Sequence, residues 1–257
     1  MEIKSINWGN PKPSLNYNFI LDAFSNTKIN SNHTSSIPLA QYWKDYTDGM
    51  QKLTKNLHLE SKTCELFFEY PTPSFSNNTS SFTDLMIFTE IAKIAIEAKY
   101  TEIVEDKHYN PIISKWLNEG TSDNSFENRK HVLTHWCDII INNGFTKKAI
   151  TTDSNMPYQF LHRTASACFD NKSNAFVVYQ VFYDLNTKHS LDNFKNILLA
   201  AITELQPTEK LHFFFHTVEI TNKIEKTTDD LDSLFPKIKL GENLFHFGSE
   251  QFTELKG

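Results

Sequence analysis

The sequence predicts an α/β fold in which a mixed β-sheet is flanked by helices. The first observation is a pair of β-prone segments within residues 82–102, which read as two antiparallel strands joined by a tight turn. The second is the apolar run 175–183, which is typical of a buried parallel strand. The third is the alternation that follows, a helical pattern over 191–205 and a strand pattern over 211–220, as in a right-handed crossover unit.

Length and composition are those of a globular protein. The chain has 257 residues, of which 39% are hydrophobic, and it fits one large domain. A net charge of −6 argues against a free-standing, high-affinity nonspecific DNA-binding protein, for which a basic excess is usual. The start of the chain lacks an apolar targeting segment and no apolar run reaches eighteen residues, so we expect a cytoplasmic protein that does not bind membranes.

The cysteines do not indicate a disulfide framework or a zinc site. Cys64, Cys137 and Cys168 are odd in number, widely separated and outside any C-x-x-C pair. Each is predicted to be a small buried apolar residue.

The first part of the chain, residues 1–60, is predicted to be mainly helical. A short extended piece is followed by a helix over 15–24 and by a stronger helix over 38–57, for which Ser36 is the candidate cap. The apolar residues of the stronger helix recur mostly at intervals of three and four, which predicts packing against the sheet: Leu39, Tyr42, Trp43, Tyr46, Met50, Leu53 and Leu57.

Residues 64–70 are predicted to form the first strand of the sheet. Pro71 and Pro73 are expected to end it, because proline cannot donate to a strand ladder. The segment 74–81 is rich in Ser and Asn and reads as a loop, which at the mouth of a site could contact phosphates.

The second strand of the predicted hairpin carries an acid and a base on one face. Residues two apart on a strand point the same way, so Glu97 and Lys99 share a face, whereas Ile94 and Ile96 point to the core.

Asp84, on the first strand of the hairpin, joins them in two alternative registers. If the turn is residues 91 and 92, Asp84 faces Lys99 and Glu97 is its diagonal neighbour. If the turn is residues 90 and 91, Asp84 faces Glu97 directly. A three-residue turn would instead place Asp84 on the opposite face of the sheet.

Two carboxylates and a lysine at one end of a sheet indicate metal-assisted hydrolysis of a phosphodiester. Carboxylate oxygens suit Mg²⁺, which takes one or two protein carboxylates together with substrate phosphate. Such an ion lowers the pKa of a bound water, and a nearby lysine can orient that water or stabilise the charge that develops on the phosphate.

Asp84, followed thirteen residues later by Glu97-Ala98-Lys99, resembles the D…E-x-K motif of the PD-(D/E)XK restriction-endonuclease-like nuclease superfamily. The resemblance covers roughly residues 65–183, with Thr83 where that superfamily often has Pro. It implies an α-β-β-β-α-β core, a Mg²⁺ or Mn²⁺ ion on Asp84 and Glu97, and a catalytic role for Lys99. The phrases T-D-L-M-I and A-I-E-A-K-Y-T-E also resemble uncharacterised bacterial proteins grouped near this superfamily.

The same resemblance draws attention to acids and amides near the motif. An additional acid is common near the metal, which makes Glu69 a candidate. The helix after E-x-K lies beside the active site in that superfamily, and here the pattern over 157–170 predicts a helix. Gln159 and Arg163 on this helix are therefore candidates for contacts with phosphate or metal-bound water, with a structural ion pair as the alternative for Arg163.

Other helices and histidines are given structural readings. Helices are expected over 111–119, ended by Gly120, and over 126–143. His131 and His135, on the second of these helices, are predicted to be surface or packing residues. His162 is predicted to be a satisfied core histidine. His212 and His216 share one face of the last strand and are given no role.

The sequence therefore predicts a single nuclease-like domain over 1–257, with a helical part over 1–60, a catalytic core over 61–221 and a C-terminal extension over 222–257. The expected activity is a Mg²⁺-dependent endonuclease that acts on DNA, with bacterial defence against foreign DNA as a setting suggested by fold-level analogy. One alternative is a catalytically silent binding or scaffold subunit, and another is a hydrolase of a small phosphodiester. A homodimer or a protein partner is the expected assembly.

Overall fold

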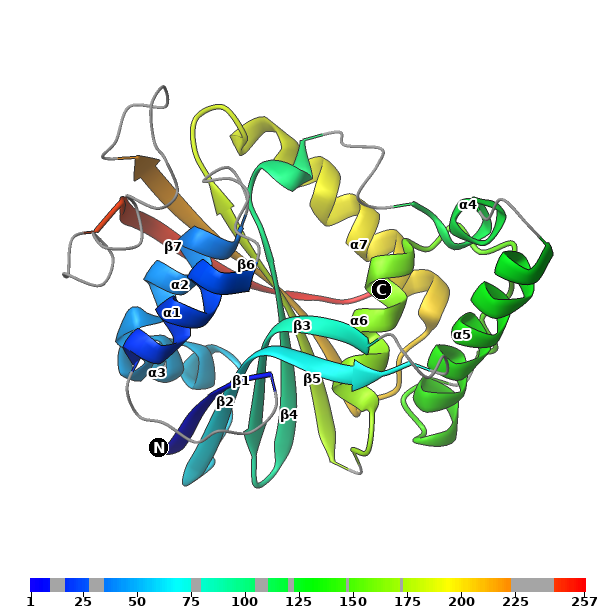
Figure 1. The fold of residues 1–257 in the computed structure, drawn as a ribbon, viewed down its shortest axis with the longest axis horizontal. Helices are drawn as coiled ribbons and strands as arrows, with labels where there is room; N and C mark the ends of the chain where they lie inside the picture. The colour runs from blue at the N-terminus through cyan, green and yellow to red at the C-terminus, as the bar shows by residue number, and fades with distance from the viewer. Residues whose placement is uncertain are drawn as a thin grey trace.

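A single mixed sheet lies between two groups of helices (Figure 1). This computed structural model describes residues 1–9, 17–27, 35–74, 80–104, 111–119, 123–146, 148–171, 173–222 and 243–257. Within them the sheet has seven strands, which lie side by side in chain order. The strands are β1 (Glu2–Trp8), β2 (Thr63–Pro73), β3 (Ser80–Thr89), β4 (Ala92–Lys99), β5 (Asn174–Tyr183), β6 (Leu211–Asn222) and β7 (Phe245–Leu255).

Helices α1, α2 and α3 cover one face of the sheet, and α6 and α7 cover the other, with α4 and α5 packed outside α6 (Figure 1). Short 3-10 turns η1 (Trp43–Asp45), η2 (Thr101–Ile103) and η3 (Lys188–Ser190) connect some of the elements. The helices are α1 (Tyr17–Thr27), α2 (Ser36–Tyr42), α3 (Tyr46–Asn56), α4 (Ile113–Asn118), α5 (Asp123–Asn142), α6 (Tyr158–Cys168) and α7 (Leu191–Leu205).

The predicted mixed character of the sheet is confirmed. The pairs β1–β2, β4–β5 and β5–β6 are parallel, and the other neighbours are antiparallel. The apolar run predicted as a buried parallel strand is β5, and α7 and β6 follow it as expected. This crossover places helix α7 on the same face as α6.

The helix expected over residues 38–57 is interrupted at its centre, where η1 separates α2 from α3. The side chain of Asp45 accepts a hydrogen bond from the N–H of Asp48 at 3.1 Å, so Asp45 is the N-cap of a new helix. Ser36, the expected cap, is instead the first residue of α2. The apolar stripe is buried against the sheet as predicted, with Tyr46 half-buried.

The outer strands also differ from the prediction. The extended piece near the N-terminus is the edge strand β1, so the strand expected to be first is the second of the sheet. β2 continues through Pro71 to Pro73 and pairs with β3. The described pairing with β1 ends at Trp8 opposite Phe68, so these prolines fall along an edge, where they are tolerated. The C-terminal extension contributes β7, which pairs with β6.

Strands β3 and β4 form the predicted hairpin, in the second of the two registers considered. Leu85 lies opposite Ile96 and Phe88 lies opposite Lys93, which leaves residues 90 and 91 in the turn. All of β4 is buried. Its even-numbered Ile and Ala side chains pack on the side of α1–α3, whereas Ala95 packs on the side of α6. Glu97 and Lys99, which are also odd-numbered, therefore face the layer that contains α6.

The three cysteines are buried and unpaired, as predicted. None of the helices in the described parts of the chain combines the length and the apolar composition that a membrane crossing needs. Gly120, the expected stop of a helix, and residues 75–79 of the expected Ser/Asn-rich loop lie outside the described residues.

Candidate active site

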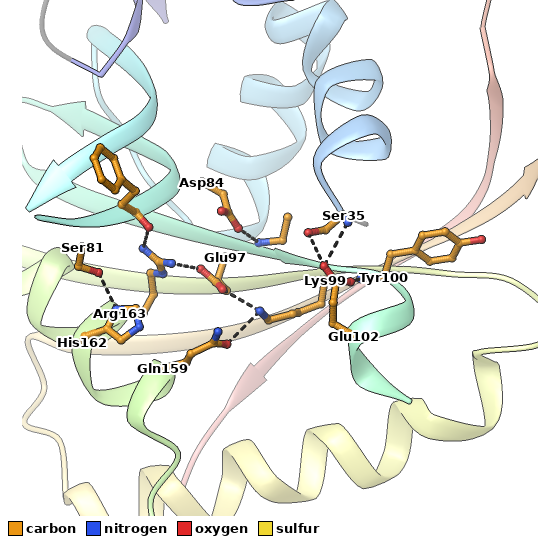
Figure 2. A network of polar contacts seen from close by, with 12 residues as sticks. Ser35, Ser81, Asp84, Glu97, Lys99, Tyr100, Glu102, Gln159, His162 and Arg163 are labelled. Carbon is orange, nitrogen blue, oxygen red and sulfur yellow. Dashed lines mark hydrogen bonds and ion pairs between the residues drawn. The ribbon is translucent and has the colours of Figure 1, made fainter. Parts of the chain in front are cut away.

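The five residues singled out in the sequence lie together on one face of the sheet (Figure 2). Asp84 comes from β3, Glu97 and Lys99 come from β4, and Gln159 and Arg163 come from α6. Because α6 packs on β3, β4 and β5, its inward side chains meet the charged face of the hairpin. The structure therefore joins two segments that are about sixty residues apart in the chain.

Glu97 and Lys99 form a buried ion pair. The Nζ atom of Lys99 lies 2.9 Å from Oε1 of Glu97. Glu97 is 4% exposed and Lys99 is 8% exposed, so little water screens the attraction. The period of two along β4 accounts for their common direction, and the cover of α6 accounts for their burial.

Leu85 lies opposite Ile96 in the hairpin, so the next position along each strand places Asp84 opposite Glu97. The Oδ2 atom of Asp84 accepts a hydrogen bond from the main-chain N–H of Ala98 at 2.7 Å, which fixes the half-buried carboxyl against the end of β4. Burial, reinforced by the negative charge of Glu97, raises the pKa of Asp84 well above its usual range. When two carboxyl groups lie close together, each disfavours the ionised form of the other. A bound cation would therefore favour ionisation of both.

Helix α6 supplies two side chains that contact the acid and the base. Arg163 forms an ion pair with Oε2 of Glu97, and its Nη1 atom donates a hydrogen bond to the carbonyl of Phe82 at 2.7 Å. One turn earlier, Oε1 of Gln159 accepts a hydrogen bond from Nζ of Lys99 at 3.0 Å. Residues four apart share one face of a helix, so both side chains reach β4.

The cations determine the charge state of Glu97. Burial opposes ionisation of this carboxyl, but the Arg163 guanidinium and the Lys99 ammonium outweigh it and lower the pKa to about 2. Burial likewise opposes the charge of Lys99, whereas the nearby carboxylates, Glu97 first, raise its pKa above the usual value. At neutral pH the centre therefore holds a carboxylate between two cations.

His162 differs from its prediction as a core histidine, because its side chain is half-buried and reaches the edge of the site. Its Nδ1 atom lies 2.8 Å from the hydroxyl of Ser81, which belongs to β3 rather than to a loop (Figure 2). Burial, followed by the positive charge of Arg163, lowers the pKa of His162 to about 3. The imidazole is thus neutral at physiological pH.

A family model spans the whole site. Residues 17–223, which are most of the chain, match the model of a family described as "Domain of unknown function (DUF6946)". The chain belongs to this family. No curated protein and no solved structure matches the chain. All five site residues lie within the DUF6946 domain.

Two buried polar atoms of the DUF6946 site have no hydrogen-bond partner among the described residues: Nε of Arg163 and the hydroxyl of Tyr179. Oε2 of Glu97 has the Arg163 guanidinium as its ion-pair partner. Tyr179 lies beside Glu97 in the parallel pairing of β4 and β5. Unsatisfied buried polar atoms are rare in folded proteins, so these two leave room at the site for a water, an ion or a ligand atom as partner. Tyr179 was not among the residues predicted for the site, although Tyr179 and Gln180 stand out in the sequence as polar side chains at the centre of an apolar run.

The donor chemistry of the DUF6946 site fits a small divalent cation such as Mg²⁺. Asp84 and Glu97 offer hard carboxylate oxygens, which are the ligands that such an ion prefers. No group of three or more His, Cys, Asp or Glu side chains arranged for a metal occurs in the described parts of the chain. In this structure Arg163 contacts Oε2 of Glu97, so a cation at that oxygen would have to share it with Arg163 or displace the guanidinium.

Glu69, the additional acid considered, lies on β2 in a left-handed backbone conformation with φ of 49°. Its charge is a minor contribution to the raised pKa of Asp84, which places it near the site but outside the ion-pair network of Figure 2.

The remaining histidines belong to other surroundings. His216 packs on the face covered by α1–α3, where its ring stacks on Phe252 and its Nε2 atom lies 3.3 Å from Glu250. His212 shares that face and stacks on Phe176. His135 on α5 lies 3.2 Å from the carbonyl of Pro73, which agrees with the packing role predicted for it.

Proposed function

We propose that this protein is a metal-dependent nuclease that hydrolyses phosphodiester bonds, with DNA as its substrate. The observation that carries the proposal is the convergence of Asp84, Glu97 and Lys99 on one covered face of the sheet, with Gln159 and Arg163 directed at them from α6. Isolated Glu–Lys pairs on strands are common on solvated surfaces, but this pair is buried.

The order of elements around the site gives independent support. The elements α3, β2, β3, β4, α6 and β5 follow one another in the α-β-β-β-α-β order of the PD-(D/E)XK nucleases that this chain resembles. Helices α4 and α5 are then additions before α6. In that scheme the first acid lies on one hairpin strand and the E-x-K motif lies on the next, as Asp84 and Glu97-Ala98-Lys99 do here.

Each side chain has a defined task under this proposal. A divalent cation held by Asp84 and Glu97 would supply Lewis acidity and lower the pKa of a bound water. Lys99, kept protonated by its carboxylate neighbours and held by Gln159, positions the attacking water and stabilises negative charge on the phosphate. Arg163 keeps Glu97 ionised and would bind a non-bridging phosphate oxygen of the substrate.

A second function, a nuclease-like subunit that only binds, is favoured by one specific observation. Both carboxylate oxygens of Glu97 are already in contact with cations of the chain, Lys99 and Arg163. A site whose charges are neutralised by its own residues is stable without a metal. The net charge of −6 also disfavours independent binding to DNA, for which proteins usually carry a basic excess.

The test is a cleavage assay on plasmid, on a single-stranded oligonucleotide and on bis(p-nitrophenyl) phosphate, each with Mg²⁺ or Mn²⁺ and with EDTA. The variants are Asp84→Asn and Lys99→Met, and Lys115→Met serves as the matched control because Lys115 is exposed on α4. We expect metal-dependent cleavage of DNA by the wild type and the control. Both site variants should lose at least about a hundredfold, as measured for other electrostatic catalytic groups.

The outcomes separate the candidate functions. Cleavage of the small diester alone would indicate a small-phosphodiester hydrolase. Equal cleavage by wild type and both site variants would refute the assignment of the site. Binding of DNA without cleavage by the folded wild type would indicate the silent subunit.

A further inference from the structure

A buried lysine lies at the end of β4 remote from the candidate active site. Lys93 is 5% exposed and shares the sheet face of Glu97 and Lys99, but it is the second residue of the strand that Lys99 ends. Six residues of strand separate the two lysines, or roughly 20 Å at about 3.3 Å per residue. The chemistry proposed above therefore makes no use of Lys93.

Three aromatic rings surround the amine of Lys93. Its Nζ atom lies 4.9 Å from the centroid of Phe88, 5.6 Å from that of Phe169 and 5.7 Å from that of Tyr70. It also donates a hydrogen bond to the carbonyl of Phe169 at 2.7 Å. These contacts hold the amine in one position, with apolar surface on several sides.

A cavity of about 440 Å³ opens beside this amine. This is within the usual size range of small-molecule sites, roughly 300–1,000 Å³. Asn171 fixes part of the rim, because its Oδ1 atom accepts a hydrogen bond from the N–H of Ser173 at 2.9 Å and its amide donates to Ala167 at 3.1 Å. The described residues that line the cavity are Phe88, Thr89, Ala92, Lys93, Asp170, Asn171 and Ser173.

The surroundings also change the acidity of the amine. Burial lowers the pKa of Lys93 to about 8, although the nearby carboxylate of Asp170 opposes the shift. At pH 7.5 about a quarter of such amines are neutral, compared with roughly one in a thousand for an ordinary lysine. A neutral amine in an apolar pocket is the form that attacks carbonyl carbons.

We propose that Lys93 is a carbonyl-reactive amine, and that this cavity binds a small aldehyde covalently as an imine. The lone pair of Nζ attacks the carbonyl carbon, and the two protons of the amine leave with the carbonyl oxygen as water while the C=N bond forms. No oxidant or reductant is needed.

The same cage suits the product. A protonated imine keeps one positive charge and one N–H, so it retains the attraction of the three rings and a donor for the carbonyl of Phe169. The charge of the protonated imine therefore needs no further carboxylate beside it. The substituent of the aldehyde lies in the cavity against Phe88.

The experiment is reductive trapping in the native full-length chain. The protein is incubated with a low excess of benzaldehyde and sodium cyanoborohydride, and the benzylated lysines are quantified by peptide mass spectrometry. We expect Lys93 to be labelled at least tenfold faster at pH 7.5 than the exposed lysines Lys55 and Lys115. The labelling rate of Lys93 should level off above about pH 8.

Two variants make the test specific. Lys93→Arg keeps the charge and should lose only the Lys93 label. Asp170→Asn removes the opposing carboxylate and should increase labelling of Lys93 several-fold at pH 7; asparagine tolerates the left-handed backbone at this position, where φ is 47°.

The proposal is overturned if native Lys93 is labelled no faster than Lys55 and Lys115, or only after unfolding. It is also overturned if Asp170→Asn leaves the rate at Lys93 unchanged. None of these readouts depends on nuclease activity, so the two proposals fail independently.

Discussion

Replacing Glu97 by glutamine tests the electrostatic centre of the protein without reference to catalysis. The change keeps the shape of the side chain and removes one negative charge. The Lys99 ammonium and the Arg163 guanidinium then lie close together without the carboxylate that neutralises both. Their side chains are only 10% and 4% exposed, so water screens the repulsion little. Glutamine can accept a hydrogen bond from one of them, but it cannot neutralise either.

The expected loss in the free energy of unfolding is about 3 kcal/mol. The pKa of Glu97 falls from 4.5 to about 2 on folding, which corresponds to roughly 3 kcal/mol at about 1.4 kcal/mol per unit. Removal of one partner from a buried ion pair typically costs about 3–5 kcal/mol, which agrees in size.

The assay is urea unfolding at pH 7, followed by tryptophan fluorescence and by circular dichroism so that coincident transitions justify a two-state treatment. Glu254→Gln is the matched control, because Glu254 pairs with Lys256 at 2.8 Å while the Lys256 side chain is 77% exposed. The control should lose less than about 1 kcal/mol. A loss for Glu97→Gln that is no larger than that of the control would refute the reasoning.

The pH dependence provides a second check on the same substitution. Because the folded-state pKa of Glu97 lies below its unfolded-state value, its stabilising contribution is complete above about pH 5 and is lost as the pH falls from 4.5 towards 2. The difference in stability between wild type and Glu97→Gln should therefore be constant from pH 7 to 5 and should shrink by pH 3. A difference that stays constant down to pH 3 would contradict the assignment.

Three further predictions concern other polar groups. Asp84→Asn should raise the unfolding free energy at pH 7, because the folded-state pKa of Asp84 is raised and its ionisation therefore destabilises the fold as pH rises. The amide oxygen of asparagine can still accept the main-chain N–H of Ala98. Urea unfolding at pH 7 that shows a clear loss of stability would contradict this. Gln159→Ala should reduce cleavage about tenfold, because it removes the hydrogen bond that holds the amine of Lys99. The free energy of unfolding should change by less than about 1 kcal/mol, because Gln159 is only half-buried. A loss of stability without a loss of cleavage would give Gln159 a structural role. Trp43→Phe should cost about 2 kcal/mol, because it removes the indole N–H that donates to buried Gln180 at 3.0 Å, and thermal unfolding that matches the wild type would exclude that contribution.

Local sequence rules predicted the elements near the site well. The period of two in β4 put Glu97 and Lys99 on one face, and the limited choice of tight turns brought Asp84 to the same face in either register. The apolar run at β5 and the pattern of α7 were also predictive, because a buried strand and an amphipathic helix each have a period that is visible in the sequence.

Local rules failed where two segments compete or where distant segments meet. Helix α2 ends at Tyr42 and Asp45 caps α3, although the apolar stripe runs through both helices. The strands β1 and β7 are recognisable only as edges of a sheet that already exists, since neither has a strong pattern of its own.

The sequence by itself determined which side chains could work together along one strand, because alternation is a property of the backbone. The tertiary structure decided what surrounds them. The docking of α6 brought Arg163 against Glu97 and Gln159 against Lys99, and the pairing of β5 placed the hydroxyl of Tyr179 beside them. Burial, which depends on all these segments together, turned an ordinary Glu–Lys pair into a site with shifted pKa values, because charges interact strongly only where water is excluded.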